Sequence, residues 1–324
     1  MSESTSSRLS VLCVTPDRLE TLFPLFRALA AQTIANQIEI VVLAPAAVMH
    51  DPLPFAETIF FRVTRHLAAA HLTNPQLRAA AVRLATSQYI VFTEDHCFPE
   101  QQWAAALVAA LDTGALGAGP VMISANTDSS VSQANFLLEY GEWSHAGAAG
   151  TVRHLPGHNS AYHRDRLVAL GDRLEAVLEL ESPWLWEESA SGAKLLCVAG
   201  ARSHHFNFST LRSSLPLRFH GGRVFGANRA RSWSMVKRVM WACALPLIVA
   251  VRWRRSLAQA TKFMPGQPLV FHLVLPTLLT ADSIGEVAGY LTGSGQAIAR
   301  VSGLEFHRGR FTNGVPVRPP FLDS

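Results

Sequence analysis

The sequence predicts an α/β fold in which a doubly wound, mainly parallel sheet is followed by a basic helical region. Short β-branched runs alternate with segments of helical periodicity up to about residue 125, which is the pattern of repeated βαβ units. Charge also divides the chain, because residues 1–200 contain 12 Lys and Arg against 20 Asp and Glu, whereas residues 201–324 contain 16 against 4. A chain of 324 residues is long enough to hold both parts.

The first unit is expected to be a strand, a helix and a second, parallel strand. The runs "RLSVLCV" (8–14) and "IEIVVL" (38–43) are apolar and β-branched. Between them, Leu and Phe recur at helical spacing from Asp17 to Gln32, and Asp17 stands where an N-cap residue is expected. A crossover helix of this length joins parallel strands.

Further strands and helices extend this sheet. They are a strand "TIFFRV" (58–63), a helix (74–85), a strand "YIVF" (89–92), a helix from Pro99 to Leu111 and a strand "GAGPVMIS" (117–124). Ligands of such sheets bind at the carboxyl ends of the strands. Residues 8–125 are therefore expected to carry a binding site at that edge.

Glu94, Asp95 and His96 follow the strand "YIVF" directly, in the stretch "FTEDHCFPE". Carboxylates and an imidazole are expected outside a core, and three of them exceed what one helix cap needs. Alternating side-chain directions would point Glu94 and His96 at a ligand, whereas an early turn would point Asp95 there instead. Capping of the helix expected from Pro99 is the alternative interpretation.

Residues 126–207 alternate less regularly. They contain a helix from about Ser130 to His145, a loop "RHLPGHNSAYHRD" (153–165), a helix after Arg164 and an apolar strand "LLCVAGARSHH" (195–205). Three histidines of this part, His154, His158 and His163, are too loosely spaced to indicate a zinc site.

The C-terminal region contains no acidic residue between Ser189 and Ala281, while basic residues recur throughout it. This bias favours an anionic partner. Two apolar segments lie at 239–251 and 268–291. The first is short for a membrane span, and the second carries Asp282 and Glu286. Arg and Trp flank the first, which is typical of helices at a membrane interface; packing of both segments as a helical hairpin is the alternative.

The four cysteines stand apart in the sequence, in no metal-ligand spacing, which indicates thiols in a reducing compartment. The polar start "MSESTSSRLS" has no apolar core of signal-peptide length. We therefore expect a cytoplasmic protein, peripheral or integral at the inner face of the plasma membrane.

The order of these pieces resembles the family 2 glycosyltransferases with the GT-A fold, which is a Rossmann-like nucleotide-sugar-binding fold. The resemblance covers residues 8–207 and rests on the order of its motifs. These motifs are "SVLCVTPDR", the Arg-containing helix "QLRAAAVRLA", the acidic "FTEDH", the loop "GHNSAYHRD", Glu181 eleven residues before Gly192, and "LLCVAGARSHH". The expected parts are a loose N-terminus (1–7), a nucleotide-binding part (8–125), an acceptor part (126–207) and a membrane-associated helical region (208–324).

The resemblance implies a metal-dependent, inverting transfer of a sugar from a nucleoside diphosphate to a hydroxyl of a glycan or lipid-linked acceptor, as in polysaccharide biosynthesis. It implies Glu181 as the catalytic base, with Glu187 and Glu188 as local rivals. It implies that the donor and its diphosphate are bound by Thr15, Asp17, Arg78, Glu94 and Asp95. It implies that the acceptor is bound by His158 and Asn159. Glu94, Asp95, His96 and His205 (or its neighbour His204) would hold Mg²⁺ or Mn²⁺.

A transferase of this kind needs positive charge at its leaving diphosphate and a carboxylate to accept the acceptor's proton, and those residue types are present.

The alternative is a non-catalytic relative that keeps the fold and binds a nucleotide or a partner, because "VVLAPAAV" is not followed by the usual acidic residue. The hypothesis that the protein binds nucleic acid is supported only by the basic C-terminal part, and we expect no nucleic-acid partner. "TPDRLE" is not a phosphate loop and no G-x-S-x-G occurs, which disfavours dinucleotide oxidoreductases, Walker ATPases and serine hydrolases.

Overall fold

The computed structural model describes residues 6–15, 18–69 and 71–308. The chain forms two compact units, which we describe separately. Of the described residues, the first contains those of 6–123 and 145–205, and the second contains those of 124–144 and 206–308.

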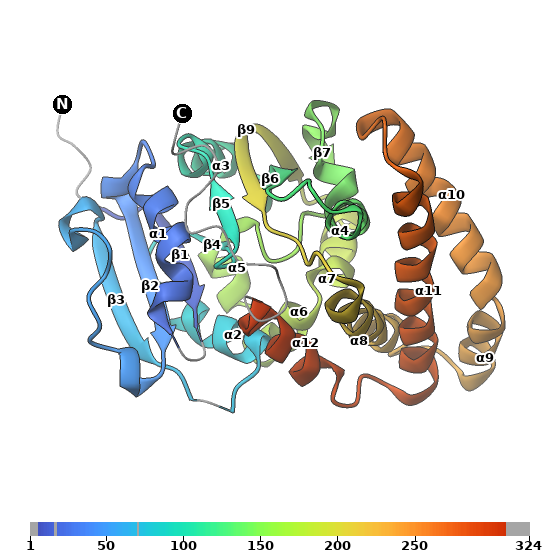
Figure 1. Ribbon diagram of the computed structural model, residues 1–324. Helices are drawn as coiled ribbons and strands as arrows, with labels where there is room; N and C mark the ends of the chain where they lie inside the picture. The colour runs from blue at the N-terminus through green and yellow to red at the C-terminus, as the bar shows by residue number, and fades with distance from the viewer. Residues whose placement is uncertain (1–5, 16–17, 70, 309–324) are drawn as a thin grey trace. The chain divides into compact units, whose positions relative to one another are not determined.

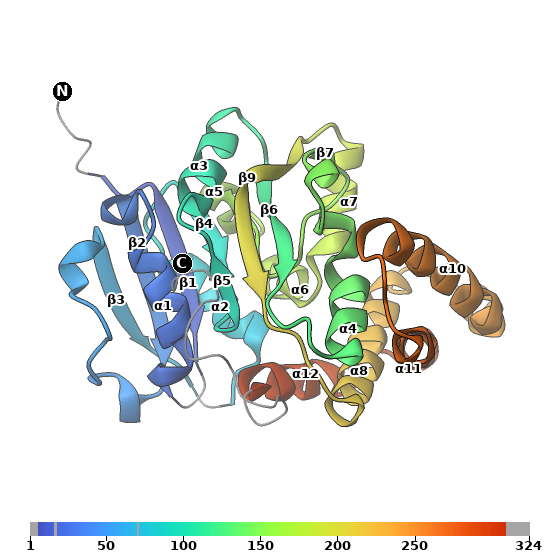
Figure 2. The same cartoon turned by 45° about the horizontal axis from the view of Figure 1, so that its top comes forward.

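The first unit is built on a mixed sheet, which has nine strands among the described residues (Figure 1). The strand order is β3-β2-β1-β4-β8-β6-β9-β5, and β7 pairs with β9. Figure 2 shows β9 beside β6. The strands are β1 (Leu9–Val14), β2 (Ile38–Ala44), β3 (Arg62–Leu67), β4 (Tyr89–Phe92), β5 (Cys97–Pro99), β6 (Gly117–Ser124), β7 (Gly150–Val152), β8 (Ala161–His163) and β9 (Leu195–His205).

The expectation of a mainly parallel sheet is wrong. Strands β1 to β4 are parallel, as the βαβ pattern predicted. However, β8 pairs antiparallel with both β4 and β6, and β9 pairs antiparallel with β5 and β7. The sequence indicated a loop where β8 lies, because three residues are too few to show a period. Their strand conformation comes from backbone pairing on both sides.

Two expected boundaries shift at the ends of the strand order. The third strand is Arg62–Leu67 rather than 58–63, and it is mostly half-exposed because β2 is its one neighbour. Pro99 ends β5 rather than beginning a helix. A proline lacks the amide that a central strand needs, and β5 is an outer strand of this order, where that loss is tolerated.

Helices lie in both units. The first unit contains α1 (Phe23–Ala30), α2 (Asn74–Leu84), α3 (Trp103–Asp112), α5 (Arg164–Val168), α6 (Leu174–Glu179) and α7 (Glu181–Ala190). The second contains α4 (Ser130–Tyr140), α8 (Leu211–Arg229), α9 (Met235–Cys243), α10 (Leu245–Phe263), α11 (Leu269–Thr292) and α12 (Ala297–Phe306).

The helix expected from Asp17 to Gln32 is shorter than predicted. A 3-10 turn at Leu19–Leu22 precedes α1, which begins at Phe23 with Pro24 in its first turn, where proline is favoured. Asp17, the expected N-cap, lies outside the described residues. The helix expected at 130–145 likewise ends at Tyr140 and continues as a 3-10 turn.

Helices cover both faces of the parallel strands. Leu9, Val11 and Cys13 of β1 share one core with α1 and α3. Successive side chains of a strand face opposite sides, so the buried Leu12 and Phe92 face the other layer. There α2 packs against β1 and β2, and the guanidinium of its Arg78 lies 6.0 Å from the ring centre of Phe92.

In the second unit α8 and α11 cross with their backbones in contact. Gly222 and Gly226 of α8 meet the main chain of Asp282 and Glu286, and a Cβ at either glycine would collide with it. Gly285 and Gly289 of α11 meet the α8 main chain in the same way. Two glycine pairs spaced four apart allow this close approach, which any side chain would prevent.

The charges that interrupt the two apolar segments pair with each other. Arg252 of α10 lies 2.6 Å from Asp282 and 3.3 Å from Glu286 of α11. Arg229 of α8 lies 3.2 Å from Glu286, which also accepts a hydrogen bond from Tyr290. The acids in the segment 268–291 are therefore neutralised within the second unit.

By length and composition, α11 is apolar enough to cross a membrane, with a mean hydropathy of 1.2 in its most apolar window. However, 44% of that window is buried inside the protein. Phe271, Leu275, Leu278 and Leu279 are fully buried, and they form a core with α4 and α10. Core helices of soluble proteins pass the same test.

Candidate active site

A short loop of polar residues leaves the sheet at the carboxyl end of β4. Because β1 and β4 are parallel neighbours, this loop and the turn after β1 lie at the same edge of the sheet. The alternative role of Glu94, Asp95 and His96 as caps is wrong, because α3 begins after Gln102 and receives no side-chain cap. The three residues are thus available for another role.

The pairing of β5 with β9 brings a distant histidine to this loop. Cys97 is paired with His205, and Phe98 with His204. Because neighbouring residues of a strand face opposite sides, His205 is directed toward the loop and His204 away from it. The Nε2 atom of His204 lies 2.9 Å from a carboxylate oxygen of Glu100. Of the two histidines left open by the sequence, the fold therefore places His205 beside the acidic motif.

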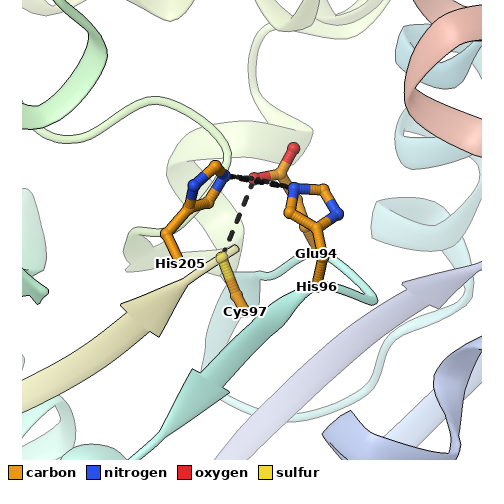
Figure 3. A group of neighbouring side chains, drawn as sticks. All are labelled: Glu94, His96, Cys97 and His205. Carbon is orange, nitrogen blue, oxygen red and sulfur yellow. Dashed lines mark hydrogen bonds and ion pairs between the residues drawn. The ribbon is translucent and has the colours of Figure 1, made fainter. Parts of the chain in front are cut away.

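Glu94, His96, Cys97 and His205 gather at this point, and we call them the Glu94 cluster (Figure 3). One donor atom of each lies within 4.8 Å of the others. The Nε2 atoms of His96 and His205 are 3.1 Å apart. The Oε2 atom of Glu94 lies 3.5 Å from His96 Nε2, 3.6 Å from His205 Nε2 and 3.9 Å from Cys97 Sγ. This arrangement can hold a metal ion.

Asp95 lies beside the cluster rather than in it. Its Oδ1 atom is 2.7 Å from Nδ1 of His96, on the side of the ring opposite Nε2. A carboxylate here accepts the Nδ1 proton and leaves the Nε2 lone pair directed at the cluster. Of the two arrangements left open by the sequence, the structure thus turns Glu94 and His96 inward and Asp95 to the side.

Two further side chains hold Glu94. The amide nitrogen of Asn159 donates to its Oε2 atom at 3.0 Å, and the Arg78 guanidinium lies 3.7 Å from its Oε1 atom. Burial alone would raise the pKa of Glu94, but His96 and His205 outweigh it, and the pKa lies well below its usual range. Glu94 is therefore a carboxylate at neutral pH, as a metal ligand must be. Asn159, predicted to contact the acceptor, positions Glu94 through this hydrogen bond.

A second carboxylate, Glu181, begins α7 and is almost fully buried. Its Oε1 atom lies 3.1 Å from Nδ1 of His158. His158 has φ = 66°, a left-handed conformation that is uncommon for a non-glycine residue. A Cβ at Gly157 would lie 3.2 Å from the Oε2 atom of Glu181, tighter than ordinary contact. The loop "GHNS" therefore fits closely around this carboxylate, and its strained residue is the one that binds it.

Arg78 relates the two carboxylates electrostatically. It is buried, contacts Glu94, and its charge also acts on Glu181. Burial alone would raise the pKa of Glu181, but His158 and Arg78 outweigh it and lower the pKa below its usual value. Glu181 is therefore ionised at neutral pH. Its negative charge, after burial, raises the pKa of Tyr162, which stays neutral.

Glu187 and Glu188, the two alternative candidates for the base, make ion pairs with arginines instead. Glu188 binds Arg166 at 3.0 Å and accepts from the indole of Trp184 at 3.1 Å. Glu187 is largely exposed and lies 4.0 Å from Arg173. Among these three acids, Glu181 is the one held against His158.

Of the two residues predicted after β1, Thr15 is buried at the turn, where its hydroxyl donates to the carbonyl of Arg18 at 2.6 Å. It lies at the same edge of the sheet as Glu94. Asp17 lies outside the described residues. Burial, and after it the charge of Asp95, raises the pKa of the Cys13 thiol near the end of β1.

Sequence reasoning missed Cys97. Cys97 forms no recognised metal-ligand spacing with another cysteine or histidine, so the sequence analysis treated it as isolated. The one feature of the sequence that could have indicated a ligand role is that Cys97 directly follows His96. The three loop histidines make different contacts: His158 binds Glu181, while the rings of His154 and His163 pack on Trp186 and Tyr89.

No protein-family model matches the sequence, and no curated protein matches it either. Among solved structures, the fold is similar to the crystal structure of GalNAc-T7 with UDP, GalNAc and Mn²⁺, at 17% identity and a TM-score of 0.46. The match covers 63% of this chain and 44% of that chain, so the chain spans less than half of that structure's length. A likeness at this level carries no conclusion about what this chain binds.

Proposed function

We propose that the protein is a glycosyltransferase that moves a sugar from a nucleoside-diphosphate donor to a hydroxyl of a glycan or lipid-linked acceptor. The observation that carries the proposal is the buried Arg78, which lies 3.7 Å from Glu94 at the end of β4 and whose charge lowers the pKa of the base candidate Glu181. A displacement at a sugar carbon needs these two kinds of group: positive charge at the leaving diphosphate and a base at the attacking hydroxyl.

In this proposal Glu181 is the base. As the acceptor oxygen bonds to the sugar's anomeric carbon, the bond from that carbon to the diphosphate oxygen breaks, and the acceptor's proton passes to Glu181. Direct attack on the face opposite the leaving group inverts the configuration. His158 holds one oxygen of Glu181 in place at 3.1 Å. Glycine at position 157 leaves room for the other carboxylate oxygen, because a Cβ there would lie 3.2 Å from it.

Positive charge at the leaving diphosphate is supplied by Arg78. The sequence led us to expect Mg²⁺ or Mn²⁺ on Glu94, Asp95, His96 and His205. Asp95 instead binds the far side of the His96 ring, and Cys97 lies in its place. One carboxylate, two imidazoles and a thiol do not fit these hard ions, which prefer oxygen ligands.

The test is donor binding. Thermal-shift and calorimetric titrations of purified full-length protein with UDP, GDP, dTDP and CMP are repeated on Arg78→Met and on Arg83→Met, an arginine of the same helix that is half-exposed. Binding of one nucleoside diphosphate, weakened in Arg78→Met and unchanged in Arg83→Met, supports the proposal. Failure of every nucleotide to bind the wild type refutes it and favours the non-catalytic alternative.

We also propose that the second unit holds the protein against an anionic membrane surface, at the inner face of the plasma membrane. Large apolar side chains are exposed on three neighbouring helices: Met235, Val236, Val239 and Met240 of α9, Leu247 and Trp253 of α10, and Leu269, Val270 and Leu273 of α11. Neither α9 nor α10 contains an acidic residue, and Lys237, Arg254, Arg255 and Lys262 are exposed on them. Apolar side chains beside unopposed basic charge suit an anionic lipid interface, where each base contributes roughly 1 kcal/mol.

Vesicle sedimentation tests this surface. Wild-type protein is expected to bind vesicles that contain phosphatidylglycerol and to bind zwitterionic vesicles weakly. Val236→Asp/Met240→Asp is expected to lose binding, whereas Val168→Asp, at an exposed apolar site of the first unit, keeps it. Equal binding to both kinds of vesicle, or retention by the double variant, refutes the membrane proposal without bearing on transferase activity.

A further inference from the structure

The four donor atoms of the Glu94 cluster, one oxygen, two nitrogens and one sulfur, all lie within 4.8 Å of one another. Zinc binds nitrogen and oxygen at about 2.0–2.2 Å and sulfur at about 2.3 Å, which puts ligand atoms roughly 3.3–3.7 Å apart in a tetrahedral site. The two histidine nitrogens are 3.1 Å apart, and Oε2 of Glu94 lies 3.5 and 3.6 Å from them and 3.9 Å from Cys97 Sγ. These four distances are close to those of a tetrahedral site, so a single ion fits between the side chains once they adjust to it.

The donor chemistry selects the class of metal. Thiolate and imidazole are ligands of zinc and of other borderline divalent ions, and the carboxylate of Glu94 completes a mixed set that these ions accept. Mg²⁺ prefers an octahedron of oxygen ligands and water, whereas three of these four buried groups offer nitrogen or sulfur. Cys97 and His205 are fully buried and His96 is nearly so.

The outer contacts of His96 point to the same kind of site. Metal-bound histidines almost always donate their other ring N–H to a carboxylate or carbonyl, which orients the ring and fixes its tautomer. Asp95 is in that position, 2.7 Å from Nδ1 of His96. Without a metal, Nε2 of His96 faces another imidazole nitrogen, so one of the two rings must donate to the other.

We propose that Glu94, His96, Cys97 and His205 bind one zinc ion, or an ion of the same class, in a closed tetrahedral site. Asp95 is its outer carboxylate. Four protein ligands leave no open position, which is the property of structural zinc sites. The ion ties the loop after β4 to the end of β9. This site stands independently of the transferase proposal, and binding is accompanied by loss of the Cys97 thiol proton to solvent.

The test uses the full chain, stripped of metal by a chelator and refilled with Zn²⁺, Co²⁺, Mn²⁺ or Mg²⁺. Bound metal is counted by mass spectrometry after gel filtration, and Co²⁺ serves as a spectroscopic probe. Cys97→Ser and His205→Gln are compared with Cys243→Ser, which changes an exposed cysteine of the second unit. Circular dichroism confirms that each variant is folded before it is titrated.

We expect one Zn²⁺ or Co²⁺ per chain, a thiolate-to-cobalt charge-transfer band and a rise in melting temperature on refilling. Cys97→Ser should lose the band, His205→Gln should bind zinc at least tenfold more weakly, and Cys243→Ser should behave like the wild type. The proposal is overturned if the wild type takes up no Zn²⁺ or Co²⁺, if Mn²⁺ or Mg²⁺ binds more tightly, or if the band persists in Cys97→Ser. None of these results depends on nucleotide binding, so failure here and failure of the transferase proposal are distinguishable.

Discussion

The Nε2 atoms of His96 and His205 lie 3.1 Å apart although 109 positions separate the two residues in the sequence. The contact depends on the register of β5 and β9, in which Cys97 faces His205. A shift of one residue would present His204 instead, and the cluster would lose a member. The short strand β5 thus decides which histidine joins the acidic loop.

Glu181→Gln should abolish most transfer while leaving donor binding intact. The amide keeps the size of the side chain but cannot accept the acceptor's proton, and a general base contributes roughly 10²–10⁴-fold. The measurement is kcat for sugar transfer together with a nucleotide titration. Glu188→Gln is the matched control, because Glu188 binds Arg166 and Trp184 and should tolerate the change. Equal losses in the two variants would remove Glu181 from the role of base.

His158→Asn should move the acid limb of the transfer rate to higher pH. Glu181 must be ionised to act, so activity falls as pH drops through its pKa. Burial raises that pKa, while His158 and Arg78 lower it. With His158 replaced, only the weaker lowering causes remain, which are the charge of Arg78 and a backbone hydrogen bond, so the pKa of Glu181 rises. Asn tolerates the left-handed conformation at this position.

The measurement for His158→Asn is kcat/KM as a function of pH, with His163→Asn as the control. His163 packs on the ring of Tyr89. An acid limb at the same pH in wild type and His158→Asn would contradict the assigned contact. Tyr162, which also lies near Glu181, stays neutral over this range because its pKa is raised.

Gly222→Ala should destabilise the second unit, whereas Gly221→Ala should not. A Cβ at Gly222 collides with the main chain of Asp282, while a Cβ at Gly221 meets nothing within 4 Å. Overpacking costs about 1–3 kcal/mol, whereas replacing an unstrained helical glycine with alanine gains up to about 1 kcal/mol. Urea denaturation of the two variants measures the difference. Similar stabilities for both would mean that α8 and α11 are not in backbone contact.

Glu39→Gln should flatten the acid side of the stability profile. Glu39 is buried in β2, where its carboxylate accepts from Ser10, from the Thr86 amide and from Arg62. Burial alone would raise its pKa, but these bonds outweigh it and the pKa is lowered. The stability it contributes is therefore present above its unfolded pKa, about 4.3, and is lost as pH falls through the folded pKa.

The free energy of unfolding, measured from pH 7 down to pH 3, should accordingly fall less steeply in Glu39→Gln than in the wild type. At neutral pH the variant should be the less stable of the two, because a buried hydrogen-bonded charge network loses a partner. Glu57→Gln is the control, since Glu57 is half-exposed and pairs with Arg65. An identical acid profile in wild type and Glu39→Gln would show that Glu39 does not titrate differently on folding.

Several elements could be predicted because their signals are local. The strands at 89–92 and 117–124 have the predicted bounds, and α2 lies within the helix predicted at 74–85. Each of these segments is long enough to show its period or is bounded by turn residues. The acidic motif could also be placed at the carboxyl end of β4, because that position follows from the strand's end alone.

Other features depend on partners far along the chain and left no local signal. The three residues of β8 became a strand between β4 and β6 through pairing on both sides. The buried, hydrogen-bonded role of Glu39 could not be predicted from its apolar strand, because its partners come from β1, β3 and the turn before β4. Arg252 and Asp282, each an interruption of an apolar segment, are partners in an ion pair.

By itself, the sequence determined the parallel βαβ start, the placement of Glu94 and His96 at a strand's end, and the excess of basic charge after residue 200, because each is a property of neighbouring residues or of composition. Only the tertiary structure decided that His205 rather than His204 faces Glu94, that Cys97 joins them, and that Asp95 turns to the far side of His96. These depend on strand register and on the path of one turn, where a single step reverses which way a side chain faces.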